Sequence, residues 1–244
     1  RGVGVNTKLY YNKTNSSGGN LYIFNANSPV SNLDIGYLYF TMLSTKQESG
    51  ADGYISNTQN KNDNIKVHDI TMYNSYANRN TSSADYSPHY GIQWHGTRDL
   101  QIYNNHLINF AWYPIEFERV NGYIIRDNYI RTSFYGMTGG STATQRYGII
   151  SGNIIVPSEN QTSYTTGMEL ENMGGEVIIT NNIIENATGT AGIRIYTGGL
   201  PTKQIDIAII ANNIFKFNDY PIVAYKYRSV SIHGNTFADN TREV

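Results

Sequence analysis

The sequence predicts an all-β protein whose short strands wind into a solenoid. One pattern of apolar residues around a polar corner recurs eight times along the 244 residues, at steps of 22 to 35 residues. A repeat of that length, built from strand-like pieces, is typical of a solenoid. The chain also holds 30 asparagines, 23 glycines and 21 tyrosines, a composition that favours turns and strands over helices. These observations predict a single-domain parallel β-helix of about eight or more coils.

The repeated pattern reads apolar, any residue, Ile or Val, two polar residues, Asn, any residue, apolar, and it is clearest over residues 176–185. Its apolar runs are too short for helices, so each copy predicts two short strands that bend at the Asn. An inward Asn at the same corner of successive coils can hydrogen-bond the turn and stack on its neighbours, so we predict a structural ladder. The slot holds Leu38, Ile70, Asn105, Asn128, Asn153, Asn182, Asn213 and Asn235.

A second strand with a period of two follows most of these corners. The five segments are 91–95, 114–118, 167–171, 192–196 and 221–225. In the remaining coil a glycine-rich segment, 135–141, stands where the strand should be, and we expect an irregular segment there. The residues predicted to point inward are Ile92, Trp94, Ile115, Phe117, Met168, Leu170, Ile193, Ile195, Ile222 and Ala224.

The pattern divides the chain into an irregular N-terminal entry, residues 1–31, and a β-helix domain, residues 32–244. One strand is expected within the entry, at 21–24. Uneven loops on one face of a solenoid are where function is usually found. Polar loops rich in Ser, Asn, Thr and Gly are expected at 44–63, 74–90 and 156–166.

Composition argues against several partners and cofactors. A net charge of −1 with 15% charged residues gives no field for a polyanion such as nucleic acid. The absence of cysteine excludes disulfides and cysteine metal sites, and no apolar run approaches the length of a membrane helix. Because no Asp-rich calcium ladder or calcium-binding nonapeptide repeat is present, we expect neither a metal nor another cofactor.

Residues that alternate with the inward ones should face outward and stack in columns, about 4.8 Å apart from coil to coil. Four carboxylates, an arginine and a histidine then share one face, and the glycine-rich coil leaves a shallow floor between two pairs of glutamates. One column is predicted to read Gln93, Glu116, Thr138, Glu169, Arg194 and Val223. The next is predicted to read His95, Glu118, Gly140, Glu171, Tyr196 and Tyr225.

Glu116 and Glu169 are expected two coils apart, roughly 10 Å between backbones. Flexible side chains bring that into the ~6.5–9.5 Å carboxyl separation of an inverting glycoside hydrolase. Arg194 beside Glu169 favours the ionised carboxylate, so Glu169 suits the base. Glu116 lies beside neutral Gln93 and near Glu118, so it should hold its proton more tightly and suits the acid. The alternative is that alternate glutamates simply keep a sheet face soluble.

Other side chains could complete this site. Glu118 and Glu171 are further catalytic candidates, together with Arg194. Sugars stack on aromatic rings through their apolar C–H faces, although such rings also pad loops onto a core. Asp85 and His89 could join from the 74–90 loop, where histidines are more often structural. The substrate-binding candidates are His95, Gln93, Trp112, Tyr113, Tyr135 and Tyr196.

The outer face of the first strands is predicted to carry four consecutive isoleucines. They form a stripe roughly 15 Å long, which should not stay exposed to water. Two explanations are open, namely cover by the chain's own loops or a contact in a homotrimer of parallel solenoids. The members are Ile124, Ile149, Ile178 and Ile209.

The coil pattern, the Asn corner and the outward carboxylates, over about residues 30–240, resemble the right-handed parallel β-helix proteins of the pectate-lyase-like class. Within that class the chain looks most like bacteriophage tailspikes and capsule depolymerases. The resemblance implies a homotrimer, a location on the virion tail or otherwise outside the cell, and acidic residues that bind and cleave bacterial surface polysaccharide. No linear motif carries these residues over. A head-binding domain and a trimerisation segment are not seen, and the abrupt start at Arg1 suggests a piece of a longer protein.

The leading expectation is therefore binding of bacterial polysaccharide and its hydrolysis by the glutamate pair, without a cofactor. One alternative is a polysaccharide lyase, which would use Arg194 or Tyr196 as the base against a uronic acid. The other is a non-catalytic receptor-binding or adhesin module, which would bind glycan without releasing reducing ends.

Overall fold

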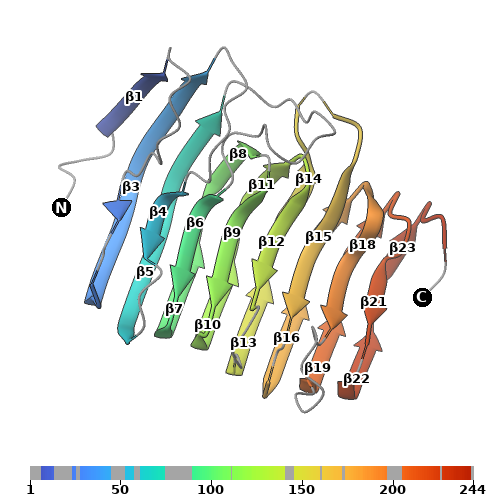
Figure 1. Cartoon of the computed structure of the whole chain (residues 1–244). Helices are drawn as coiled ribbons and strands as arrows, with labels where there is room; N and C mark the ends of the chain where they lie inside the picture. Colours follow the sequence, from blue (N-terminus) through green and yellow to red (C-terminus); the bar gives the residue numbers. More distant parts are fainter. Residues whose placement is uncertain are drawn as a thin grey trace.

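The computed structural model describes residues 7–13, 24–25, 28–44, 53–57, 61–74, 90–110, 112–140, 146–159, 161–171, 174–196, 205–225 and 227–242. These residues form 23 strands, and none of them lies in a helix long and apolar enough to cross a membrane. Every pairing between the described strands is parallel. Successive coils lie side by side from the N-terminal to the C-terminal end (Figure 1), so the predicted parallel β-helix is confirmed.

The larger sheet has 15 strands in two rows, which meet at β5. The early strands β3 and β5 are long enough to serve both rows, whereas later coils use two short strands. Its members are β1 (Thr7–Lys13), β3 (Ser31–Ser44), β5 (Asn62–Asn74), β7 (Thr97–Tyr103), β8 (His106–Phe110), β10 (Asn121–Arg126), β11 (Tyr129–Thr132), β13 (Arg146–Ser151), β14 (Ile154–Pro157), β16 (Glu176–Thr180), β17 (Ile183–Glu185), β19 (Ile205–Ala211), β20 (Ile214–Lys216), β22 (Tyr227–His233) and β23 (Thr236–Ala238).

The smaller sheet has eight strands and carries the outward carboxylates. A complete coil contains one strand of this sheet followed by two of the larger one, as in β9, β10 and β11. Its members are β2 (Phe24–Asn25), β4 (Gly53–Asn57), β6 (Tyr90–His95), β9 (Tyr113–Glu118), β12 (Tyr135–Gly139), β15 (Tyr164–Glu171), β18 (Ala187–Tyr196) and β21 (Ile222–Ala224).

All eight copies of the repeat stack in the register that the pattern predicts. The first apolar position of each copy pairs with the same position of the next, so one inward column runs the length of the larger sheet and fills the core. That column contains Leu33, Ile65, Leu100, Tyr123, Gly148, Val177, Ala208 and Val230.

The Asn slot forms a continuous hydrogen-bonded ladder. Asn153 donates its side-chain amide to Oδ1 of Asn182 at 2.9 Å and to the carbonyl oxygen of Ile125 at 3.0 Å. Asn182 repeats this toward Asn213, also at 2.9 Å, and Asn153 and Asn182 are buried. Because each amide satisfies the turn above and the turn below, the predicted scaffold role is confirmed.

The residue before the slot takes a left-handed backbone in every coil, with φ between 51° and 67°. Glycine, Asn and Asp adopt this conformation most readily, which explains why the repeat places small polar residues there. Tyr37 is the exception. The set is Tyr37, Asp69, Asn104, Asp127, Gly152, Asn181, Asn212 and Gly234.

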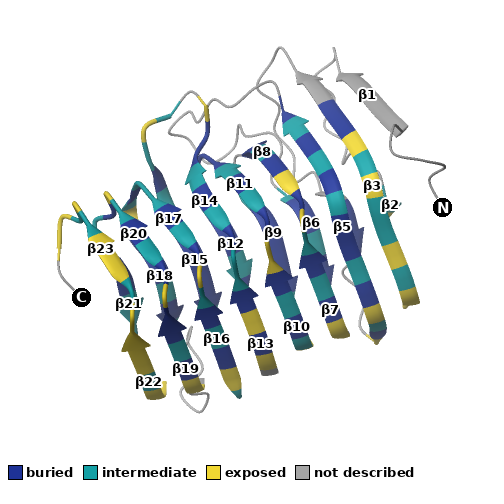
Figure 2. Cartoon of the chain, turned by 180° about the vertical axis from the view of Figure 1, so that it is seen from behind, coloured by how far each residue is buried: buried dark blue, intermediate teal, exposed yellow. Residues whose placement is uncertain are grey.

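The inward residues predicted for the smaller sheet are buried, apart from Ala224 in the last coil, which is half-buried. Figure 2 shows buried positions running through successive strands and yielding to exposed ones at β22 and β23. Ile222, in the last strand of this sheet, still exposes only 7% of its surface. Among the described residues, β22 and β23 pair with a neighbouring strand on one side only, which leaves their side chains more exposed.

Two expectations about irregular segments were wrong. The glycine-rich segment forms a regular strand, β12, which pairs with both β9 and β15. The expected loop at 44–63 contains β4 and the first residues of β5. In both places parallel neighbours satisfy the backbone, and this outweighs the low strand propensity of Gly and Ser. Within the N-terminal entry β2 begins at Phe24, and residues 21–23 lie outside the described chain.

Candidate active site

The two outward columns of the smaller sheet have the predicted register. Glu116 pairs with Gln93 on one side and Thr138 on the other. Thr138 pairs with Glu169, which in turn pairs with Arg194. In the second column His95 pairs with Glu118, and Glu171 pairs with Tyr196. The sheet therefore brings all four glutamates to one face.

The four carboxylates differ in exposure. Glu116 and Glu169 expose only 7% and 6% of their surface, although the alternation predicted that they would face solvent. Side chains only one rung away cover them, because parallel strands lie about 4.8 Å apart. Glu118 and Glu171 are partly exposed. The second column is therefore the one that a polymer in solvent could reach.

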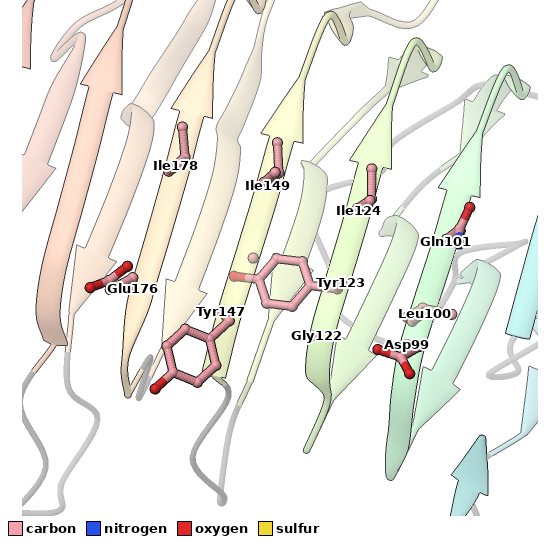
Figure 3. Close-up of a pocket in the computed structure, with 11 residues that line it drawn as sticks. Asp99, Leu100, Gln101, Gly122, Tyr123, Ile124, Tyr147, Ile149, Glu176 and Ile178 are labelled. Carbon is pink, nitrogen blue, oxygen red and sulfur yellow. The ribbon is translucent and has the colours of Figure 1, made fainter. Parts of the chain in front are cut away.

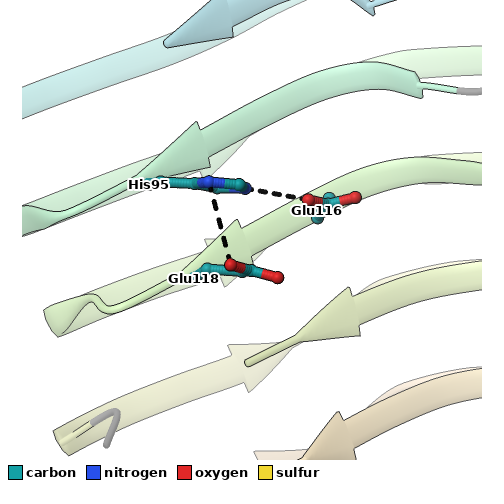
Figure 4. A group of neighbouring side chains, drawn as sticks. All are labelled: His95, Glu116 and Glu118. Carbon is teal, nitrogen blue, oxygen red and sulfur yellow. Dashed lines mark hydrogen bonds and ion pairs between the residues drawn. The ribbon is translucent and has the colours of Figure 1, made fainter. Parts of the chain in front are cut away.

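His95 is bound tightly to Glu116. Its Nε2 lies 2.8 Å from Oε1 of Glu116, and each side chain exposes 9% of its surface. The same oxygen accepts from Nε2 of Gln93 at 3.1 Å. Nδ1 of the ring lies 3.8 Å from Oε2 of Glu118 (Figure 4). It also lies 3.5 Å from Nη2 of Arg119. His95 therefore bridges a buried carboxylate and a partly exposed one.

The same three side chains are the candidate metal ligands of the described chain. Their ligand atoms lie within 4.8 Å of one another. However, the two ring nitrogens of His95 face different carboxylates, so an ion on one nitrogen is not directed toward both. The guanidinium of Arg119 beside Nδ1 also disfavours a second cation. We therefore interpret His95, Glu116 and Glu118 as a hydrogen-bonded and ion-paired cluster.

On the other side of the Thr138 rung, Glu169 pairs with Arg194. Nη1 of Arg194 lies 2.9 Å from Oε1 of Glu169, and its guanidinium carbon lies 4.2 Å from the centre of the Tyr196 ring. Burial raises the pKa of Tyr196, and the carboxylates of Glu169 and Glu171 raise it further. The Tyr196 phenol therefore keeps its proton at neutral pH.

Glu171 is the carboxyl group whose protonated form the site favours. Burial raises its pKa above the ordinary value of 4.5, and the neighbouring carboxylates of Glu169 and Glu118 raise it further. A hydrogen bond from Tyr196 and the charge of Arg194 act in the opposite direction. Glu171 was a candidate from the sequence, but its suitability as the acid follows only from these neighbours.

The aromatic residues predicted to lie beside the carboxylates stack on one another. Trp112 stacks on Phe134 with 4.5 Å between ring centroids, and Tyr113 stacks on Tyr135 at 4.7 Å. Burial raises the pKa of Tyr113, and Glu169 is the largest charged contributor, which places this ring beside the site.

Tyr90, Tyr113 and Tyr135 form a row of rings, here called the aromatic wall, and Tyr90 was not among the predicted residues. Its ring lies 6.0 Å from that of Tyr113. Burial raises its pKa to about 12, with further contributions from Glu116 and Glu118. The sequence did contain a signal for it. In three successive coils a tyrosine stands directly before the glycine or proline that opens the second strand, and these tyrosines are Tyr90, Tyr113 and Tyr135.

Two further sets of predicted residues lie elsewhere. Asp85 and His89 fall outside the described residues. The four isoleucines do stack in successive strands of the larger sheet, in the order Ile124, Ile149, Ile178 and Ile209. Ile149 is 39% exposed. The homotrimer stays a prediction.

A protein-family model described as "Right handed beta helix region" matches residues 54–237. Among solved structures, the chain is similar to an alginate lyase from Paenibacillus sp. str. FPU-7, with 13% identity, a TM-score of 0.36, and 96% of this chain and 89% of that chain covered. It is also similar to the A-module of the Azotobacter vinelandii mannuronan C-5 epimerase AlgE4, with 9% identity, a TM-score of 0.27, and coverages of 96% and 87%. Comparison with curated proteins gave no match.

The family match confirms the right-handed β-helix, while the resemblance to tailspikes stays a prediction. Identities and TM-scores this low carry no argument about activity.

Proposed function

The chain belongs to the right-handed β-helix family, so its coils present side chains at a fixed spacing. We propose that the outer face of the smaller sheet binds and hydrolyses an extracellular polysaccharide. The proposed substrate is a bacterial surface glycan that lies along the outer face of β6, β9, β12, β15 and β18. The proposed reaction is hydrolysis with inversion, carried out by a pair of glutamates without a cofactor.

One observation carries this proposal, namely the rung that separates the two pairs of glutamates. Glu116 and Glu169 both pair with Thr138, so they lie two rungs apart. Two rungs correspond to roughly 10 Å between backbones. Inverting hydrolases need carboxyl groups ~6.5–9.5 Å apart, so that a water molecule fits beside the sugar. Thr138 and Gly140 stand between the pairs, so the described residues of that rung put no long side chain into the space.

We assign the chemistry to the more exposed pair, Glu118 and Glu171. Glu171 suits the general acid because its pKa is raised, and it would protonate the glycosidic oxygen as the bond to the leaving sugar breaks. Glu118 suits the base that takes a proton from the attacking water. Glu116 and Glu169 are buried and paired, so we assign them positioning roles.

The aromatic wall supports a carbohydrate substrate. Tyr90, Tyr113 and Tyr135 occupy successive rungs beside the carboxylates. Aromatic side chains with a few placed polar groups are the usual lining of ligand sites. A ladder of tyrosines would guide a polymer along the helix axis, past the acid and the base.

The lyase alternative is less well supported. Its proposed bases are Tyr196, whose raised pKa opposes the phenolate form, and Arg194, which is ion-paired with Glu169 and lies over the Tyr196 ring. A lyase would also release an unsaturated sugar with ultraviolet absorbance. The same assay therefore separates the two reactions.

The test is release of reducing ends from a panel of bacterial capsular and exopolysaccharides. Glu118→Gln and Glu171→Gln should each lower the rate by about 10²–10⁴-fold, while binding of the polysaccharide is retained. The first anomer released, followed by NMR, should be inverted. Glu185→Gln, on β17 and paired with Lys216, is the matched control and should keep full activity.

Four outcomes would overturn the proposal. Cleavage that survives both substitutions would reject the assigned pair, and a larger loss in Glu116→Gln and Glu169→Gln would return the chemistry to the buried pair. Unsaturated products would establish a lyase. Binding without release of reducing ends from any substrate would establish a non-catalytic recognition module.

A further inference from the structure

A concave surface lies around the corner from the carboxylates, on the outer face of the larger sheet. It is a hollow of about 340 Å³ over β7, β10, β13 and β16 (Figure 3). Only two residues, Arg119 and Val120, separate the end of β9 at Glu118 from the start of β10. The hollow and the proposed active site therefore lie on either side of the bend between the smaller and the larger sheet.

A missing side chain creates the hollow. Four successive coils place Asp99, Gly122, Tyr147 and Glu176 at adjacent positions of the sheet. Gly122 has φ of +83°, and a Cβ at this position would lie 2.9 Å from Oδ1 of Asp99. The Asp99 carboxylate therefore lies over Gly122, and the glycine adds no side chain of its own between that carboxylate and Tyr147, as Figure 3 shows.

The floor of the hollow is apolar, and the side-chain amide of Gln101 lies at one end of it. One step further along the strands, the same coils place Gln101, Ile124, Ile149 and Ile178 side by side. Ile149 is 39% exposed. Part of the predicted isoleucine stripe is thus the floor of a pocket whose size is that of a small-ligand site.

Tyr147 stands out from this surface. It is 60% exposed and has φ of +50°, a conformation that a bulky side chain rarely adopts. The neighbouring coils fill the same position with Asp99 and Gly122, which tolerate it. Strained residues of this kind concentrate at ligand sites, and the exposed ring offers a face for stacking.

We propose that this hollow binds one uncharged or amino-bearing pyranose unit. The C–H face of the sugar would pack on Tyr147 and the isoleucine floor, and its hydroxyl or ammonium groups would donate to Asp99, Glu176 and Gln101. Among the described lining residues none is cationic, so a uronate would find no positive partner and would be repelled by Asp99 and Glu176. The inference rests on the proposed function in taking this sugar to be part of the same polysaccharide.

Saturation-transfer NMR with free monosaccharides tests the hollow without any cleavage. In a Tyr113→Ala background, which interrupts the tyrosines beside the glutamates, glucose, galactose and glucosamine at millimolar concentrations should give signals that Tyr147→Ala removes and Tyr147→Phe retains. Tyr227→Ala is the matched control, because Tyr227 is an exposed tyrosine on β22 outside the hollow, and it should keep the signals. Glucuronate should bind at least several-fold more weakly, and Asp99→Asn should reduce that difference.

Signals that survive Tyr147→Ala, or glucuronate that binds as well as glucose, would overturn the proposal. So would a mass near three times 27.4 kDa that Ile149→Glu reduces to one chain, because a second copy would then cover the floor. Reducing-end release reports separately on the glutamates. A protein that binds sugars at Tyr147 but cleaves nothing would leave this inference standing while rejecting the proposed reaction.

Discussion

His95 and Glu116 form a buried pair, with Nε2 2.8 Å from Oε1 and only 9% of each side chain exposed. The pair joins adjacent strands, β6 and β9, at the centre of the carboxylate face. The other ring nitrogen faces Glu118. His95 therefore links two adjacent strands through contacts with a buried carboxylate and a partly exposed one.

Replacing His95 by Leu should destabilise the protein by about 2–4 kcal/mol, because Glu116 stays buried with one fewer donor. His95→Gln keeps an N–H donor and should lose less. Urea denaturation of both variants measures the difference. Equal losses would show that the packing of the ring, rather than the contact with Glu116, matters.

Glu171 should govern the alkaline limb of the pH–rate profile. A general acid works only while protonated, so activity should fall as pH rises through the raised pKa of Glu171. Initial rates from acid to neutral pH would locate this limb. A profile without an alkaline limb would remove Glu171 from the acid role.

The same carboxyl should make stability depend on pH. Its pKa is raised in the folded state, so its contribution is fully present below the ordinary value of 4.5 and is lost as pH rises through the folded value. Unfolding free energies of the parent protein and Glu171→Gln should therefore diverge with increasing pH, the parent losing more. Parallel curves would contradict the raised pKa.

Arg194→Met should leave Glu169 as a buried, unpaired carboxylate. The side chain of Glu169 is 8% exposed and that of Arg194 is 30% exposed, so we expect a loss of about 2–4 kcal/mol. The double variant Arg194→Met/Glu169→Gln should recover part of that loss, because the uncompensated charge is gone. A double-mutant cycle by chemical denaturation checks this, and simple additivity would exclude the pairing.

Asn182→Ala should break the ladder at its centre. The substitution removes the acceptor of both the backbone and side-chain N–H groups of Asn153 and the donor to Ile150. Buried groups left without partners cost about 1–3 kcal/mol each, so we expect a loss of about 2–5 kcal/mol by thermal or urea unfolding. Asn121→Ala, at an exposed position, should change stability by less than about 0.5 kcal/mol.

Gly148→Ala should be destabilising although its backbone is ordinary. A Cβ at this inward position would overlap the ring of Tyr123 from the previous coil, and overpacking costs about 1–3 kcal/mol or more. The double variant Gly148→Ala/Tyr123→Leu should be more stable than Gly148→Ala alone. If it is not, the glycine has a role other than making room for that ring.

The fold could be predicted because its evidence is local and repeated. The alternation of apolar residues sets which side chains enter the core, and the Asn slot sets the corner, so the paired columns from Leu33 to Val230 follow from spacing alone. The prediction of an irregular segment at 135–141 was wrong because it also rested on local evidence alone. Local propensity argues against a strand there, but the neighbouring strands β9 and β15 impose one.

Within the candidate site, the sequence placed Glu116, Glu118, Glu169 and Glu171 on one face but could not rank them. Burial separates the first column from the second, and the raised pKa of Glu171 depends on carboxylates from other strands. Tyr90 and the hollow beside Gly122 were missed for a similar reason. Each is defined by what lies one rung away, not by its own sequence context.

By itself, then, the sequence determined the repeat, the parallel register, the Asn182 ladder and the face that carries the glutamates, because all of these are periodic properties of the chain. Only the tertiary structure decided that Glu116 and Glu169 are buried, that the pKa of Glu171 is raised, and that Tyr147 stands beside a gap. The physical reason is that exposure, charge and cavity shape arise between coils, where residues 22 to 35 positions apart come within about 5 Å of one another.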